Sequence, residues 1–139
     1  MRIDSIELFH IAIPRATSGA TGSASADDSS RATGSASATA VGPLETVLVR
    51  MQSGSTVGWG EASPGNGPHT SGEWAGGVFA TLRRWLVPAL VGRDVASGED
   101  LREHLVPFKG NPFAKSALDT AWWDLAARLR GEPLHRILA

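Results

Sequence analysis

The sequence predicts an α+β fold in which an antiparallel sheet of three strands packs against a layer of three helices. The hydrophobic period is 2 up to residue 62 and becomes 3.6 after residue 70, so strands precede helices. Strands followed by helices are typical of α+β domains. The chain has 139 residues. That length fits one domain over 1–139 and is too short for a (β/α)8 barrel of about 250 residues.

Three segments alternate apolar and polar residues and are predicted strands: 2–13, 44–52 and 56–62. The first has apolar residues on both faces, which predicts a central strand that is covered on both sides. A short Ser-Gly-Ser turn joins the second strand to the third and makes them an antiparallel hairpin. Gly58 and Gly60 share one face of the third strand, and we interpret them as the place where another layer approaches the sheet closely.

Helical spacing predicts three helices, over 70–86, 98–105 and 112–130. Thr70 and Glu73 have the spacing of a capping box at the start of the first helix. Pro88 follows that helix and is predicted to end it, because proline lacks the backbone N–H that a helix needs.

The third helix has the clearest boundaries. Asn111 is predicted to be its N-cap, with proline at the first helical position. Two i,i+4 ion pairs are predicted on its edges, Lys115 with Asp119 and Asp124 with Arg128. The apolar residues predicted to be buried on it are Phe113, Ala117, Leu118, Ala121, Trp122, Leu125 and Leu129.

Residues 15–42 differ from the rest of the chain because they are almost all alanine, serine, threonine and glycine. The sequence ATGSASA occurs at 20–26 and again at 32–38. Such a segment buries too little apolar surface to offset its ordering entropy. It is therefore predicted to be a flexible, low-complexity loop within the single domain.

Composition excludes several classes of protein. Lysine and arginine number 13 against 14 acidic residues, a net charge of -1, which argues against nucleic-acid binding. The absence of cysteine excludes disulfide scaffolds and cysteine-ligated metals. No apolar run approaches the roughly 20 residues of a membrane span, and no signal peptide is visible, so a cytoplasmic protein without membrane contact is expected.

The residues alone predict no catalytic constellation and no metal site. The four histidines are scattered, and neither H-x-H nor H-E-x-x-H occurs. The serine hydrolase motif G-x-S-x-G is absent as well. Glu61 follows Val57 and Trp59 on an apolar strand face, where a buried carboxylate would need a partner. The alternative is that Glu61 lies in solvent at the end of the strand or bonds to the following loop.

Three stretches nevertheless resemble a known family: RIDSIELFHIAIP at 2–14, LETVLVRMQSGSTVGWGEASPGNGP at 44–68, and KGNPFAKSALDTAWWDLAARLRGEPLHRILA at 109–139. Together they are similar to the N-terminal capping domain of the mandelate racemase/muconate lactonizing enzyme group of the enolase superfamily. The GWGE and AKSALD runs are most similar to the o-succinylbenzoate synthase and N-acylamino acid racemase branch. The resemblance implies a three-stranded antiparallel meander followed by a helical bundle.

The resemblance also implies a function. In this family the domain caps a C-terminal (β/α)8 barrel, which holds the Mg²⁺ ligands and the catalytic lysines and acts on a small carboxylate substrate. Two loops of the cap close over that substrate. One corresponds to part of residues 15–42, and the other carries Asn66, Pro68 and His69, which are the substrate-facing candidates here.

On this interpretation the 139 residues are a fragment that holds no catalytic residue, binds no Mg²⁺ itself and is inactive alone. The alternative is a stand-alone, non-catalytic interaction domain derived from such a cap. In that case the helix faces that normally meet the barrel are exposed, and a homo-oligomer is expected.

Overall fold

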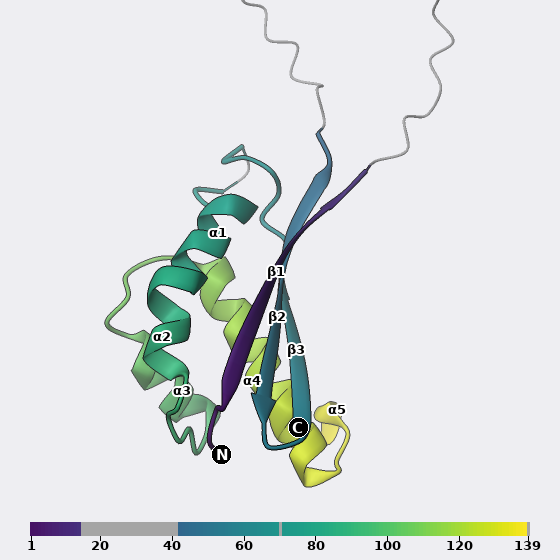
Figure 1. Cartoon of the computed structure of the whole chain (residues 1–139), viewed down its shortest axis with the longest axis vertical. Helices are drawn as coiled ribbons and strands as arrows, with labels where there is room; N and C mark the ends of the chain where they lie inside the picture. Colours follow the sequence, from purple (N-terminus) through teal and green to yellow (C-terminus); the bar gives the residue numbers. More distant parts are fainter. Residues whose placement is uncertain (15–41, 70, 139) are drawn as a thin grey trace, which may run out of the picture.

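The computed structural model describes residues 1–14, 42–69 and 71–138, and it confirms the predicted α+β fold. Three strands form one antiparallel sheet in the order β1-β2-β3, and the helices pack on one of its faces (Figure 1). The strands are β1 (Ser5–Ile13), β2 (Leu44–Ser53) and β3 (Thr56–Ala62). The helical elements are α1 (Ala75–Thr81), the π-helical turn η1 (Leu82–Leu86), α2 (Val87–Leu90), α3 (Gly98–Leu105), α4 (Pro112–Arg130) and α5 (Leu134–Ile137).

The core lies between the sheet and the helices. Val47, Val49 and Met51 point from the central strand β2 into this core and are fully buried. Helix α4 runs along β3, and the two glycines of β3 permit this approach, as predicted. A β-carbon at Gly60 would lie 2.0 Å from the carbonyl oxygen of Ala117, and one at Gly58 would lie 2.4 Å from that of Ala121.

The prediction that the first strand is central is wrong, because β2 lies between β1 and β3. Ile6 and Leu8 of β1 pack toward the helices, whereas Phe9 and Ile13 lie on the face that the helices leave open. The rings of Phe9 and Trp59 approach each other on this open face, with centroids 6.0 Å apart. Apolar residues on both faces of β1 therefore reflect an exposed aromatic contact and not a second covering layer.

The first helix differs from its prediction at both ends. It begins at Ala75 and has no side-chain cap, so the predicted capping box is wrong; Thr70 lies outside the described residues. Pro88 does not end the helix, because the helical run continues to Leu90. The π-helical turn η1 precedes this proline, and there the N–H of Val87 bonds to the carbonyl of Leu82. The wider turn accommodates a residue that has no N–H of its own.

Helix α4 has the boundaries that the sequence predicts, and Gly131 ends it in the left-handed conformation with φ 65°. The predicted ion pair between Asp124 and Arg128 is confirmed, with N and O 3.0 Å apart. Asp124 also accepts a hydrogen bond from the backbone N–H of Trp59 at 2.9 Å, which ties α4 to β3. The prediction that Leu129 is buried is wrong, since 45% of it is exposed.

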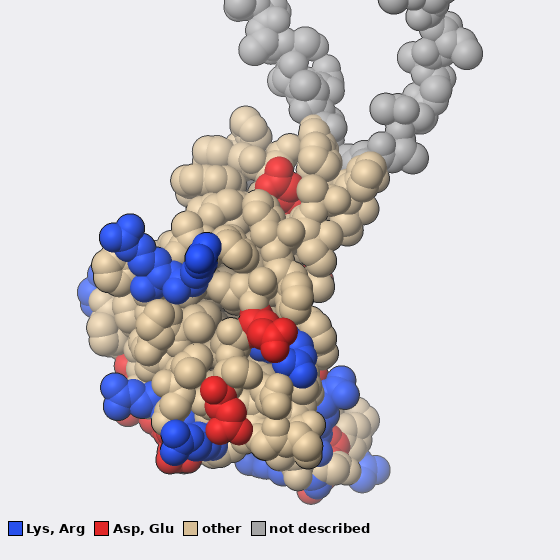
Figure 2. Space-filling view, in the orientation of Figure 1, with Lys and Arg blue, Asp and Glu red and all other residues tan. Residues whose placement is uncertain are grey.

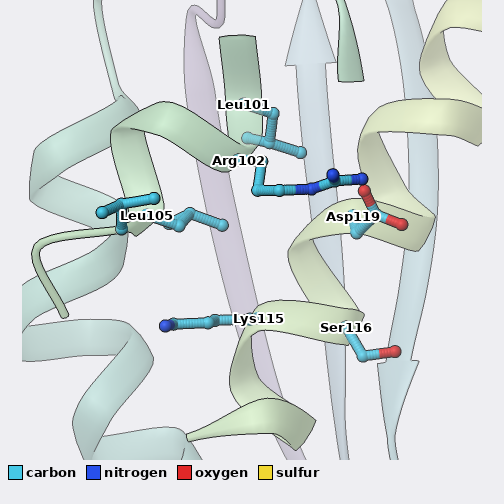
Figure 3. Close-up of a pocket in the computed structure, with 7 residues that line it drawn as sticks. Leu101, Arg102, Leu105, Lys115, Ser116 and Asp119 are labelled. Atoms are coloured by element: carbon cyan, nitrogen blue, oxygen red, sulfur yellow. The ribbon is translucent and has the colours of Figure 1, made fainter. Parts of the chain in front are cut away.

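Two polar contacts of α4 also differ from prediction. Asn111 occupies the N-cap position, but its φ of 56° is left-handed and its side chain does not cap the helix. Lys115 does not pair with Asp119; its ammonium group donates to the carbonyl of Phe108 instead. Figure 3 shows the two side chains pointing apart along the groove between α3 and α4. The turn before α4 thus offers Lys115 a backbone acceptor that helical spacing cannot indicate.

The remaining helices to describe are α3 and the short helix α5. Ser97 caps α3 by accepting a hydrogen bond from the N–H of Asp100 at 3.1 Å, and α3 has its predicted bounds. Residues 134–137 form the short helix α5. None of the helices in the described part of the chain is both long enough and apolar enough to cross a bilayer.

Candidate functional site

The candidate site is the end of the sheet at which β1 ends, β2 begins and β3 ends. Ile13 pairs with Leu44, and Val47 pairs with Ala62, so both connecting segments leave the sheet from this end. The N- and C-terminal labels lie at the opposite end of the domain (Figure 1). On the face shown in Figure 2, blue side chains gather over the helices and the lower end, whereas the loop end is mostly uncharged. We call this region, with residues 63–69, the loop end.

The structure places all three sequence-predicted residues at the loop end. Asn66, Pro68 and His69 are exposed and lie in one turn after β3. The N–H of His69 bonds to the carbonyl of Gly67 at 2.8 Å, which closes the turn. The amide of Asn66 lies against Gly42, where an added β-carbon would be 2.3 Å from Nδ2. The loop is thus packed beside the start of β2 and still presents three side chains to solvent.

Glu61 is exposed near the end of β3 and bonds to the following loop, which is the second of the two alternatives that the sequence left open. Its Oε1 accepts hydrogen bonds from the hydroxyl of Ser63 at 2.5 Å and from that of Thr46 at 2.8 Å. The Ser63 hydroxyl, followed by that of Thr46, lowers the pKa of Glu61 below its ordinary value of 4.5, while partial burial opposes the shift. Thr46 is itself buried, and its one hydroxyl proton is shared between Glu61 and the carbonyl of Ala62, which lies 2.9 Å from the hydroxyl oxygen. This network fixes the first residue of the loop on the sheet.

The lowered pKa of Glu61 makes a pH-dependent contribution to stability. Because the folded-state pKa lies below 4.5, the contribution is present above pH 4.5 and is lost as pH falls through the folded-state value. We expect Glu61→Gln to lower the free energy of unfolding at pH 7 by at most about 1 kcal/mol, since the exposed group is screened by solvent. Urea unfolding between pH 3 and 7 should show this difference shrinking toward acid pH. As a control, Ser63→Ala should move the Glu61 pKa back toward 4.5, and a difference independent of pH would contradict the assignment.

Sequence reasoning missed a side-chain hydrogen bond between His10 and Glu45 at the loop end. Nε2 of His10 lies 2.8 Å from Oε2 of Glu45, and the His10 ring stacks on Phe79 of α1 with centroids 5.8 Å apart. No local pattern indicates this pair. Only the register of β1 against β2, with Ala12 opposite Glu45, places the two side chains diagonally on one face.

The described residues of the loop end carry side chains that could contact a ligand but not a cluster that could hold a metal. Glu45 and Glu61 lie on opposite faces of the sheet, since Glu61 pairs with Leu48 and the strand alternates its side chains. Over the described ranges no group of three or more histidine, aspartate or glutamate side chains gathers to hold a metal. What the loop end offers is an exposed amide, a proline and an imidazole above a fixed sheet edge.

Comparison with protein families decides the identification. The model of the family "Mandelate racemase / muconate lactonizing enzyme, N-terminal domain" matches residues 24–139. The chain belongs to this family. The resemblance seen in the sequence motifs is therefore confirmed, and so is the fold that it implies, a meander followed by helices.

Curated members of the enolase superfamily are similar over about two thirds of this chain. N-succinylamino acid racemase from Thermus thermophilus is 37% identical over 92 residues, which are 66% of this chain and 25% of the racemase. The o-succinylbenzoate synthase from Bacillus subtilis is 29% identical over 92 residues, again 66% of this chain and 25% of the enzyme. The chain thus matches about a quarter of the length of these relatives and corresponds to their N-terminal domain.

Solved structures agree with this assignment. The substrate-liganded L-Ala-D/L-Glu epimerase from Bacillus subtilis superposes with a TM-score of 0.74 at 29% identity, covering 100% of this chain and 34% of the epimerase. Muconate lactonizing enzyme from Pseudomonas putida superposes with a TM-score of 0.75, covering 100% of this chain and 32% of the enzyme. Its identity of 22% supports the fold alone.

Proposed function

We propose that this domain acts as the cap of an enolase-superfamily enzyme and that its loop end covers the substrate bound by a C-terminal (β/α)8 barrel. The observation that carries the proposal is that both connecting segments of the meander leave the sheet at one end. There Asn66, Pro68 and His69 are exposed together. A cap of this kind excludes water and shapes specificity by closing over the substrate.

The proposed reaction is removal of the proton alpha to a carboxylate. Relatives named as racemases of N-succinylamino acids support a small carboxylate with an acylated amine as the substrate to test first. When bound, Mg²⁺ would stabilise the negative charge that develops on the carboxylate as the proton leaves. The described residues do not fit a magnesium site, because Glu45 and Glu61 lie on opposite faces of the sheet. We therefore assign the metal ligands and the acid–base residues to the barrel and derive no chemical step from this domain.

The role left to this domain is to position and enclose the substrate. Asn66 can donate a hydrogen bond to a carboxylate or acyl oxygen through its amide, and the His69 imidazole can donate or accept. Pro68 lies between them and restricts the backbone of the turn. The Glu61 network holds the start of the loop on the sheet, so the three side chains project from a fixed base.

A domain exchange tests the cap function. We expect the 139-residue chain alone to cause no exchange of the alpha proton of N-succinylamino acids in D₂O with Mg²⁺. A chimaera in which residues 1–139 replace the N-terminal domain of the Thermus thermophilus racemase should show this exchange, followed by proton NMR. In the chimaera, His69→Ala and Asn66→Ala should each raise KM by about tenfold. A tenfold change corresponds to the loss of roughly 1.4 kcal/mol of substrate binding free energy, which is typical of one lost hydrogen bond.

Two controls make the domain exchange decisive. The racemase barrel without any N-terminal domain gives the background rate, and Glu99→Ala, a change on the exposed surface of α3, should leave the KM of the chimaera unchanged. Exchange by the isolated chain would contradict the proposal. A chimaera that folds but is no faster than the barrel alone would also contradict it and favour the stand-alone interaction domain.

A further inference from the structure

Glu73 connects two parts of the chain that are 40 residues apart. Its Oε1 accepts a hydrogen bond from the backbone N–H of Phe113, in the first turn of α4, at 3.0 Å. The residue expected to cap this turn does not do so, because Asn111 is left-handed and its Nδ2 donates to the carbonyl of Lys109 at 2.9 Å. A carboxylate from another segment thus caps the 19-residue helix, where the positive end of the helix dipole favours negative charge.

Two residues after Glu73, the backbone of Ala75 closes the segment that contains the loop of residues 63–69. The N–H of Ala75 bonds to the carbonyl of Gly65 at 2.8 Å, which joins the start of the loop to the start of α1. Just before α1, the hydroxyl of Ser71 accepts from the N–H of Glu73 at 3.2 Å and donates to its carbonyl at 3.0 Å. The backbone around Glu73 is therefore tied to the loop, while its side chain is tied to α4.

The second carboxylate oxygen of Glu73 makes the hydrogen bond of the first oxygen to Phe113 more important. Oε2 of Glu73 is buried and has no hydrogen-bond partner among the described residues. Burying such an oxygen is unfavourable, so the bond of Oε1 to Phe113 and the helix dipole must compensate. A glutamine at this position would keep a carbonyl oxygen for Phe113 but would lose the charge and bury an unpaired NH₂ group.

We propose that Glu73 is a positioning residue that fastens the loop of residues 63–69 to α4. Through this contact Glu73 determines how far the side chains of Asn66, Pro68 and His69 lie from the end of the sheet. This inference rests on the proposed function, in which these side chains face the substrate. The part of the molecule that determines the position of the loop is then the helical layer and not only the strand from which the loop emerges.

Amide hydrogen exchange of the 139-residue chain tests the inference without substrate or barrel. In Glu73→Ala we expect the amides of Phe113, His69 and Ala75 to exchange about tenfold faster, as for loss of a charged hydrogen bond. The amide of Val49 in the central strand should keep its rate. Glu73→Gln should rescue part of the protection at all three positions, because it retains one acceptor oxygen.

A second cap provides the matched control. Ser97→Ala removes the side-chain cap of α3 and should accelerate the amide of Asp100 while leaving His69 and Ala75 unchanged. The inference is overturned if Glu73→Ala accelerates Phe113 alone, since Glu73 would then be only a helix cap. It is equally overturned if all amides accelerate uniformly in both Glu73 variants, Val49 included. Because these rates involve no turnover, their outcome is independent of the activity of the chimaera.

Discussion

Gly60→Ala is expected to destabilise the domain by about 3 kcal/mol or more. The added β-carbon would lie 2.0 Å from the carbonyl oxygen of Ala117 and 2.8 Å from the backbone nitrogen of Ala121. Both atoms belong to the backbone of α4, so no side-chain rotation relieves the overlap and the helix must move away from β3. Overpacking of this kind costs about 1–3 kcal/mol when side chains can yield, and more when backbone must shift. Urea unfolding followed by tryptophan fluorescence measures the effect.

Gly72→Ala is the matched control for this substitution. Nothing lies within 4 Å of the β-carbon that it would add, so the same chemical change should alter stability by less than about 0.5 kcal/mol. Comparison of the two variants separates the close approach of α4 from the general effect of alanine on the unfolded chain. If Gly60→Ala unfolds at the same urea concentration as the unmodified chain, α4 does not approach β3 this closely in solution.

The periodicity of the sequence predicts the elements well because burial on one face of an element imposes that periodicity. The three strands, α3 and α4 follow this rule closely. Gly58 and Gly60 were also interpretable, because two glycines on one strand face leave room that only a close neighbour fills. The loop end follows from the same topology, since a meander must place its first connection and its exit at one end of the sheet.

Most of the failures concern contacts or strand neighbours that are distant in sequence. Glu73 has the spacing of a local capping box, yet its carboxylate bonds to Phe113, and no local pattern distinguishes these alternatives. The contact of His10 with Glu45 requires the strand register. Apolar residues on both faces of β1 predict a central strand, yet β1 is an edge strand. The periodicity of a segment reports which faces are apolar but not the order of strands in the sheet. The predicted helix end at Pro88 is wrong for a local reason. The π-helical turn that accommodates this proline has no sequence signal of its own.

The apolar stripe of α4 supports a second large prediction, for Leu125→Ala. Leu125 is fully buried, and its backbone and β-carbon lie where a side chain at Gly58 would have to fit. Truncation to alanine removes buried apolar atoms and leaves a cavity, because α4 is held against β3 by Asp124 and cannot close the space freely. Such substitutions cost about 2–5 kcal/mol, so we expect a loss within that range in urea unfolding.

Leu129 is the internal comparison, since it continues the same stripe by one helical turn and yet is 45% exposed. Leu129→Ala should therefore change the free energy of unfolding by less than about 0.5 kcal/mol, although the two leucines are equivalent by helical spacing. Leu129 instead lines a shallow, open hollow with Met1, Ala96 and Trp122, and the helical period alone cannot indicate that this position is left partly uncovered. Equal losses for the two variants would show that Leu129 is as fully covered in solution as Leu125.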